Sequence, residues 1–323
     1  MTSTRKTRVG RNGLAAPWQR WGGYALLAVA LLALVVFLFF RGSRRETYGE
    51  PWLEFSGKNA LAQTQKLVDF GPRPPGSAAL KDARVYIKEQ LEKFGWQVEL
   101  QTFTDDTPRG KVAFVNLIAR QPNESKRGKL FLLCSHYDTK SFDSIRFVGA
   151  DDGGSSTGAL LEMARVLSLH PRLASHIELV FFDGEEAYNG YSKNDGLYGS
   201  RYFAKQIKKT GTTKRYRGGI LWDMIGDRNL TITLSPDSPE QLTRDIFAAA
   251  VALNARDHFT YATSNTLDDH NALNEIGIPT IDLIDFDYPP WHTAEDTMDK
   301  LSAESLQTVG AVTAYYLAEM AFR

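Results

Sequence analysis

Six side chains of the kind that bind metals or move protons occupy comparable points along this chain. Each stands just past an apolar run or just before a helical segment, and the six are His136, Asp152, Glu185, Glu186, Asp223 and His292. Two imidazoles and several carboxylates, brought together, suit zinc with one coordination position left open for a reactant. The single cysteine, Cys134, excludes both a cysteine-based zinc site and a disulfide framework within the chain.

Each of these side chains also has an ordinary structural interpretation when it is taken alone. An aspartate after a strand is often a turn former or a helix cap, and two adjacent glutamates often begin a solvated helix. A histidine such as His136 is often hydrogen-bonded in a core. The joint occurrence of the six at successive strand ends is what favours a site. Asp138 is a candidate acceptor for the N–H of a metal-bound imidazole, whereas His170, His176 and His258 follow no such pattern and are interpreted as surface residues.

The elements that must position these side chains alternate between strands and helices. The apolar patterns predict strands over 97–103, 112–118, 129–134, 178–182, 219–222, 230–234 and 278–284, and helices over 57–70, 77–94, 155–169, 197–208, 239–253 and 303–322. This order predicts an α/β fold with a twisted, mostly parallel central sheet flanked by helices. Ligands of such sheets bind beyond the carboxyl ends of the strands, so the six side chains are expected to converge in one crevice.

The composition narrows the class of protein further. The chain has 323 residues, with 38 lysines and arginines and 38 aspartates and glutamates, so its formal net charge is zero. A neutral chain has no overall field that would gather nucleic acid, and we exclude nucleic acid as a partner. The length corresponds to one large domain or two small ones and is sufficient for a substantial buried core.

The amino-terminal part predicts a membrane anchor. The uncharged apolar run 22–40 is long enough to cross a bilayer as a helix. More basic residues precede the run than follow it, which predicts a single-pass protein whose catalytic domain lies outside the cytoplasm, in a periplasmic, extracellular or lumenal space. A cleaved signal peptide is disfavoured, because its apolar core would be shorter and no small-x-small site follows residue 40.

The predicted organisation therefore has four parts. They are a cytoplasmic tail over 1–21, a transmembrane anchor over 22–40 in contact with the lipid bilayer, a linker over 41–55 and a catalytic domain over 56–323.

The chain also carries ordered sequence blocks that are specific to one enzyme family. In order, they are GADDGGSSTGALLEMARVL, ELVFFDGEEAY, GLYGSRYFA, LWDMIGD, DDHNAL and WHT. These blocks resemble those of the zinc exopeptidase family, the aminopeptidase type that also contains the glutaminyl-peptide cyclotransferases. They span residues from about 130 to 300, and a weaker similarity that includes FGPRPPGS extends back to about residue 60.

The resemblance implies a role for each residue of the crevice. It implies that Asp152, Glu186 and His292 bind the catalytic zinc, and that Glu185 is the general acid and base. This division is chemically reasonable, because a carboxylate bound to metal is occupied while its neighbour stays free to move a proton.

The number of zinc ions differs within the family. In its dinuclear aminopeptidases, Asp152 would bridge to a second metal held by His136 and Asp223. The cyclases keep similar residues and use one zinc, so the resemblance implies one zinc here, with two as the alternative.

Other residues resemble the cyclases more than the aminopeptidases. Asp268 stands in an Asp-Asp-His block of the cyclase form, and Trp291 stands where the cyclases carry an indole that lines the pocket. The chain departs from animal cyclases at Tyr191, where they carry a pocket tryptophan, and at Asp282, where they carry a histidine. Tyr191 and Trp291 are therefore interpreted as substrate-binding residues. Asp268 and Asp223 are expected to hold the acid/base residue and the tetrahedral intermediate in place.

These residues favour a glutaminyl-peptide cyclotransferase, which converts the amino-terminal glutamine of a peptide or protein to pyroglutamate and releases ammonia. Zinc would polarise the side-chain amide, and Glu185 would carry the proton from the α-amine to the departing ammonia. The alternative is a zinc aminopeptidase, in which Glu185 would activate water. A binding module without catalytic activity is disfavoured, because no expected ligand is missing.

Overall fold

The computed structural model describes residues 2, 10, 29–33, 48–122 and 129–322, and all elements named below lie in the compact unit that begins at Thr47. Most of the run 22–40, where the sequence predicts an anchor, lies outside the described residues. Residues 29–33 of that run are helical. Among the residues that the structure describes, none forms a helix of the length and apolar character needed to cross a membrane.

An eight-stranded sheet runs through the unit in the order β1-β2-β4-β3-β5-β8-β6-β7. Its strands are β1 (Gln97–Thr107), β2 (Gly110–Arg120), β3 (Leu130–His136), β4 (Ile177–Phe182), β5 (Tyr216–Asp223), β6 (Ile232–Leu234), β7 (Phe259–Tyr261) and β8 (Thr280–Ile284). The seven predicted strands are all present. The sequence analysis missed β7, which is only three residues long.

The prediction of a mostly parallel sheet holds for its centre and not for its two sides. Strands β4, β3, β5 and β8 are parallel neighbours, and β3 and β4 are buried at every position, as expected of strands covered on both faces. On one side, β1 and β2 form a hairpin around a two-residue turn, and β2 pairs antiparallel with β4. On the other side, β6 pairs antiparallel with β8 and parallel with β7.

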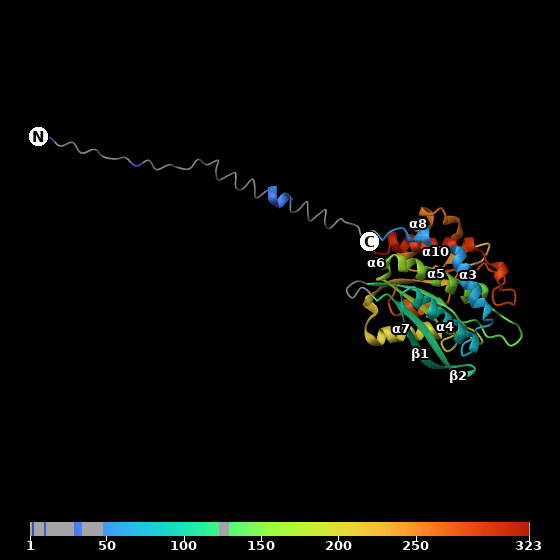
Figure 1. Cartoon of the computed structure of the whole chain (residues 1–323). Helices are drawn as coiled ribbons and strands as arrows, with labels where there is room; N and C mark the ends of the chain where they lie inside the picture. Colours follow the sequence, from blue (N-terminus) through green and yellow to red (C-terminus); the bar gives the residue numbers. More distant parts are fainter. Residues whose placement is uncertain (1, 3–9, 11–28, 34–47, 123–128, 323) are drawn as a thin grey trace. The chain divides into compact units, whose positions relative to one another are not determined.

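The helices cover both faces of this sheet (Figure 1). They are α2 (Pro51–Glu54), α3 (Gly57–Asp69), α4 (Ala78–Lys93), α5 (Ser156–Leu169), α6 (Pro171–Ala174), α7 (Tyr198–Thr210), α8 (Glu240–Ala252), α9 (Asp269–Glu275) and α10 (Ala303–Glu319).

Strand β3 shows how the sequence divides the core between the two faces. Phe131 and Leu133 point into the larger hydrophobic cluster, which includes side chains of α3, α5 and α10. Leu132 and Cys134 alternate with them and join the cluster under α7 and α9. Cys134 is thus a buried thiol of the core.

Part of the predicted linker belongs to the folded unit. The ring of Tyr48 makes an edge contact with Phe322 at a centroid distance of 5.9 Å, and Trp52 contacts Tyr315 at 4.9 Å. Phe55 is buried in the core. Three aromatic side chains therefore attach residues from 48 onward to the domain, because their burial stabilises this segment against α10 and the end of the chain.

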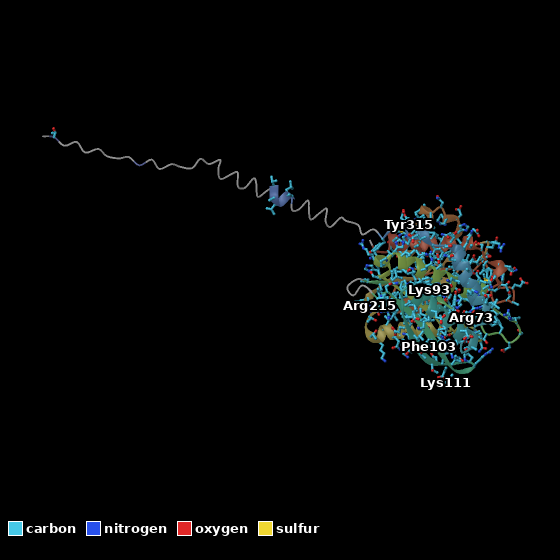
Figure 2. All side chains as sticks on the ribbon, in the orientation of Figure 1. Arg73, Lys93, Phe103, Lys111, Arg215 and Tyr315 are labelled. Carbon is cyan, nitrogen blue, oxygen red and sulfur yellow. The ribbon has the colours of Figure 1, made fainter. Side chains whose placement is uncertain are left out.

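Arg73, from the FGPRPPGS segment and labelled in Figure 2, holds the loop that leads into the site. Its guanidinium is fully buried and donates to backbone carbonyls of Tyr137, Val148 and Gly149. Burial lowers the pKa of Arg73 to about 10, although Asp296, Asp138 and Asp152 act in the opposite direction. Arg73 thereby holds the two ends of the loop after β3 together.

Candidate metal and catalytic site

The strand register places the carboxyl ends of the central strands side by side. His136 pairs with Phe182, whose chain continues into the Glu185 segment, and Asp223 pairs with Ile284. The residues that follow these strands therefore meet at one edge of the sheet, as the sequence analysis expects.

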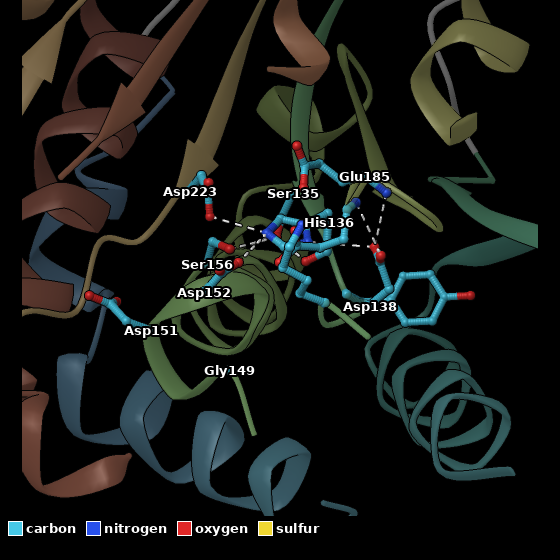
Figure 3. A network of polar contacts seen from close by, with 12 residues as sticks. Ser135, His136, Asp138, Gly149, Asp151, Asp152, Ser156, Glu185 and Asp223 are labelled. Carbon is cyan, nitrogen blue, oxygen red and sulfur yellow. Dashed lines mark hydrogen bonds and ion pairs between the residues drawn. The ribbon is translucent and has the colours of Figure 1, made fainter. Parts of the chain in front are cut away.

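His136, Asp152 and Asp223 form a buried group at this edge (Figure 3). The Nε2 atom of His136 lies 3.1 Å from Oδ1 of Asp223 and 3.3 Å from Oδ1 of Asp152. Burial lowers the pKa of His136, but the charge of Asp223 and the hydrogen bonds with these aspartates outweigh it and raise the pKa well above its usual value.

Asp152, Glu186 and His292 form a second group that shares Asp152 with the first. Nε2 of His292 lies 3.3 Å from Oδ2 of Asp152 and 3.2 Å from Oε2 of Glu186. Burial lowers the pKa of His292, but its hydrogen bonds with Asp152 and Glu186 dominate and raise that pKa to about 9. The two oxygens of Asp152 thus face two different histidines, which is the arrangement of a carboxylate able to bridge two metal ions.

The donor set fits zinc. Each group offers one imidazole nitrogen and two carboxylate oxygens, and the ligand atoms within each group lie within 4.8 Å of one another. Three protein ligands of this type leave a fourth tetrahedral position open, as catalytic zinc sites do. The buried carboxylates create a local field that favours a cation, and the raised pKa values of both histidines report the same field.

Asp152 is positioned by a tight turn and by a distant carboxylate. Asp296 accepts hydrogen bonds from the backbone N–H of Asp151 at 2.8 Å and of Asp152 at 3.2 Å, and it also accepts one from the hydroxyl of Tyr288 at 2.8 Å. Gly153 has a φ of +74°, and a methyl group there would lie 2.9 Å from the His136 ring, so the turn requires glycine. The sequence analysis did not single out Asp296.

Asp138 orders the turn that carries the two glutamates. Its carboxylate accepts from the backbone N–H of Glu185 at 3.2 Å and of Glu186 at 3.3 Å, as Figure 3 shows for Glu185. Its Oδ1 also lies 3.5 Å from Nδ1 of His136. Asp138 therefore has the position expected of an acceptor for a metal-bound imidazole, and it links the two halves of the site.

Glu185 is buried at the wall of the pocket and has a perturbed acidity. Burial raises its pKa well above the usual carboxyl range, and the charge of Glu186 adds to the effect. A raised pKa makes a carboxyl group a better acceptor for a proton that it must later return. Its Oε2 accepts a hydrogen bond from the hydroxyl of Tyr191 at 3.0 Å.

Asp268 is both the cap of a helix and a residue of the pocket wall. It is the N-cap of α9 and forms a capping box with Asn271, whose side chain accepts from the backbone N–H of Asp268 at 2.9 Å. It also lines the pocket. Burial and the neighbouring charge of Asp282 raise the pKa of Asp268, and burial likewise raises the pKa of Asp282.

His270 and Asp282 complete a third buried group with Asp268. Burial lowers the pKa of His270 to about 4, so this imidazole is neutral at physiological pH. The sequence analysis noted Asp282 only as a departure from animal cyclases and did not associate it with His270. Asp282 lies inside β8 and not beyond its end, so the strand-end rule could not have found it.

A cavity of about 700 Å³ opens over the site. The predicted residues on its wall are Asp152, Glu185, Tyr191, Asp223, Asp268 and Trp291. Trp291 stacks on the ring of His292 with centroids 4.1 Å apart and meets Phe286 edge-on at 5.4 Å. Hydroxyl and amide side chains from β6, β7 and the following loop also line the cavity. The cavity thus combines aromatic side chains with polar ones on its wall.

The part of the chain that carries the site matches a known protein family. Residues 116–317 match peptidase family M28. This chain belongs to that family. Among curated M28 relatives, the glutaminyl-peptide cyclotransferase of Bothrops jararaca is 32% identical over 78% of this chain and 78% of its own length. The enzyme of that name from Drosophila melanogaster is 30% identical over 76% of this chain and 77% of its own length.

Solved structures of similar proteins show the same fold. The glutaminyl cyclase of an Acidobacteriales bacterium superposes with a TM-score of 0.76 and 34% identity, covering 81% of this chain and 94% of that one. A Zn-dependent exopeptidase from Parabacteroides distasonis superposes with a TM-score of 0.76 and 28% identity, covering 82% of this chain and 98% of that one. The family resemblance inferred from the sequence blocks is thereby confirmed.

Proposed function

We propose that this M28 protein is a zinc-dependent glutaminyl-peptide cyclotransferase. The observation that carries the proposal is that one pocket brings together a metal-ligand set, the buried Glu185, the capped Asp268 and the indole of Trp291. The names of the curated relatives support the same activity over most of the chain. The substrates are amino-terminal glutamine residues of peptides and proteins.

The proposed ligands of a single catalytic zinc are Asp152, Glu186 and His292. Zinc bound there supplies a Lewis acid that polarises the side-chain amide carbonyl of the substrate. His136 contacts the other oxygen of Asp152 and also contacts Asp223. In the proposed cyclase, His136 and Asp223 hold Asp152 and the neighbouring charges in position.

The proton follows a path through Glu185. The α-amine of the substrate attacks the δ-carbonyl carbon of its own side chain, and Glu185 accepts the proton that this nitrogen loses. The carbon–nitrogen bond of the side-chain amide then breaks, and Glu185 returns the proton so that ammonia leaves with a five-membered ring as product. Asp268 and Asp223 line the pocket beside Glu185 and hold the reacting groups in place.

Ring closure needs the amine about 3 Å from the side-chain carbonyl carbon, a folded substrate conformation that a tight pocket must enforce. Trp291 supplies a flat apolar surface against which the amide side chain packs. Thr233 and Thr260 line the same cavity, and we propose that their hydroxyl groups contact the residues that follow the glutamine.

A zinc aminopeptidase is the second candidate, and one observation favours it. The bridging position of Asp152 between His136 and His292 would serve two metal ions as well as one. In that case Glu185 would take a proton from a water molecule that attacks the first peptide bond.

The purified protein should release one molecule of ammonia from each peptide molecule that begins with glutamine. The mass of the product should be lower than the mass of the substrate by the mass of ammonia. Leucine- and alanine-initiated peptides should remain intact, because they lack the side-chain amide that the amine attacks. Coupled ammonia detection and mass spectrometry measure both. Free amino acids released from leucine peptides, without ammonia from glutamine peptides, would establish the aminopeptidase and refute the cyclase.

We also propose that the run 22–40 anchors the protein in a bilayer with its catalytic domain outside the cytoplasm. A reporter that is active only in the periplasm or extracellular space, fused after Arg323, should show activity. A matched fusion to a reporter that works only in the cytoplasm should be silent. Activity of the cytoplasmic reporter alone would contradict the proposed orientation.

A further inference from the structure

We infer that Tyr191 is a positioning residue of the reaction, whose hydroxyl orients the carboxylate of Glu185. This inference rests on the proposed function and assigns Tyr191 a part in the chemistry. The sequence interpretation made it only a wall of the substrate pocket.

The phenol hydroxyl contacts both glutamates. It lies 3.0 Å from Oε2 of Glu185 and 3.3 Å from Oε2 of Glu186. A hydroxyl has a single hydrogen and can donate fully to one acceptor at a time. Glu186 is a proposed metal ligand whose carboxylate already faces His292. Glu185 is therefore the acceptor that gains most from this donor.

The hydrogen bond leaves Glu185 with one oxygen for the proton. Oε2 accepts from Tyr191, while Oε1 accepts no hydrogen bond from any residue in the described part of the chain. A carboxylate held at one oxygen cannot rotate freely, so Oε1 is kept in one orientation. A general acid and base that collects a proton from one nitrogen and delivers it to another needs that fixed orientation.

The ring of Tyr191 is itself held in place. It lies against Gly196, where a methyl group would be only 2.7 Å from its Cδ1 atom. Gly196 has a φ of +84°, so both the backbone conformation and the contact require glycine there. Lys140 lies over the ring with Nζ 5.7 Å from the centroid, and the same Nζ donates to the carbonyl of Ala187 at 2.6 Å.

The loop that carries Tyr191 is organised around one carboxylate. Asp195 accepts from the backbone N–H of Tyr188 and of Asn189 at 2.8 Å each. Backbone hydrogen bonds between Ser192 and Asp195 close the turn that follows Tyr191. The position of the phenol is thus specified by loop, ring and hydroxyl contacts together, which distinguishes it from an exposed tyrosine that lies near the site only by chance.

The test is Tyr191→Phe, which removes the hydroxyl and keeps the ring. We expect kcat for ammonia release from a glutamine-initiated peptide to fall about 10- to 100-fold, the usual effect of losing one hydrogen bond to a charged group. KM and the zinc content of the purified protein should stay at wild-type values. Tyr188→Phe is the matched control, because Tyr188 stands on the same loop and does not line the pocket; it should retain the wild-type kcat.

Three results would overturn the inference. They are a wild-type kcat in Tyr191→Phe, a rise in KM with kcat unchanged, and a loss of zinc that accounts for the lost rate. The second would make Tyr191 a substrate wall, and the third would make it a support for Glu186. Failure of the proposed function itself is a separate result, because the wild-type protein would then release no ammonia in the same assay.

Discussion

Glu185→Gln should slow the release of ammonia by about two to four orders of magnitude, the range over which general acid–base catalysis contributes. Glutamine has nearly the same shape as glutamate and can still accept the hydrogen bond of Tyr191, but its amide cannot take up and return a proton. Because the adjacent Glu186, and not Glu185, belongs to the metal-ligand group, the zinc content should be unchanged. Steady-state kinetics and elemental analysis of the same preparation measure the two quantities.

Glu275→Gln is the matched control for this experiment. Glu275 is exposed at the end of α9, the helix that Asp268 caps, so the same chemical change there should leave the rate unaltered. A near-normal rate in Glu185→Gln would remove Glu185 from the proton path. In that event Asp268, whose pKa is also raised by burial, would become the next residue to test.

His292→Ala should release the metal and abolish turnover. The wild-type protein is expected to retain about one zinc per chain after dialysis, and the variant should retain almost none, because one of three protein ligands of a tetrahedral site is lost. Removing the imidazole also takes away the group that faces both Asp152 and Glu186, although His136 still faces the other oxygen of Asp152. Elemental analysis and the rate of ammonia release test this expectation, with circular dichroism to verify folding.

His258→Ala serves as the control, since His258 lies at the surface after α8 and belongs to none of the metal-ligand groups in the described chain. Full zinc content in His292→Ala would contradict the proposed ligand set. Two zinc ions per wild-type chain, both needed for activity, would instead favour the aminopeptidase with Asp152 as the bridge.

The ligand candidates could be predicted from the sequence because most of them follow a buried strand, directly or after a loop, and Asp152 stands just before a helix. The apolar runs before His136 and Asp223 ended as expected, and the register aligned those ends at one edge. The pairing of neighbouring strands was harder to predict from the sequence. A short strand such as β7 and the antiparallel partners of β2 and β6 depend on contacts that no local periodicity records.

Asp268 has one role that the sequence predicts and another that only the folded structure shows. Its position before a helix predicts a cap, and the cap is present. That the same side chain also faces the pocket beside Glu185 and neighbours Asp282 follows from how α9 packs against β8, which only the folded chain reveals. A cap and a functional carboxylate are therefore compatible roles at one position.

The sequence by itself determined the fold class, the order of the longer elements and the six side chains of the metal and acid/base site, because burial periodicity and the residue types after each strand are local properties. Only the tertiary structure decided how these side chains are oriented. Asp296 fixes the turn at Asp152 from 144 positions away in the chain, and the phenol of Tyr191 reaches Glu185 only because its loop folds back over Gly196. Such orientations are set by contacts between distant segments and by loop conformations, and neither leaves a periodic signal in the sequence.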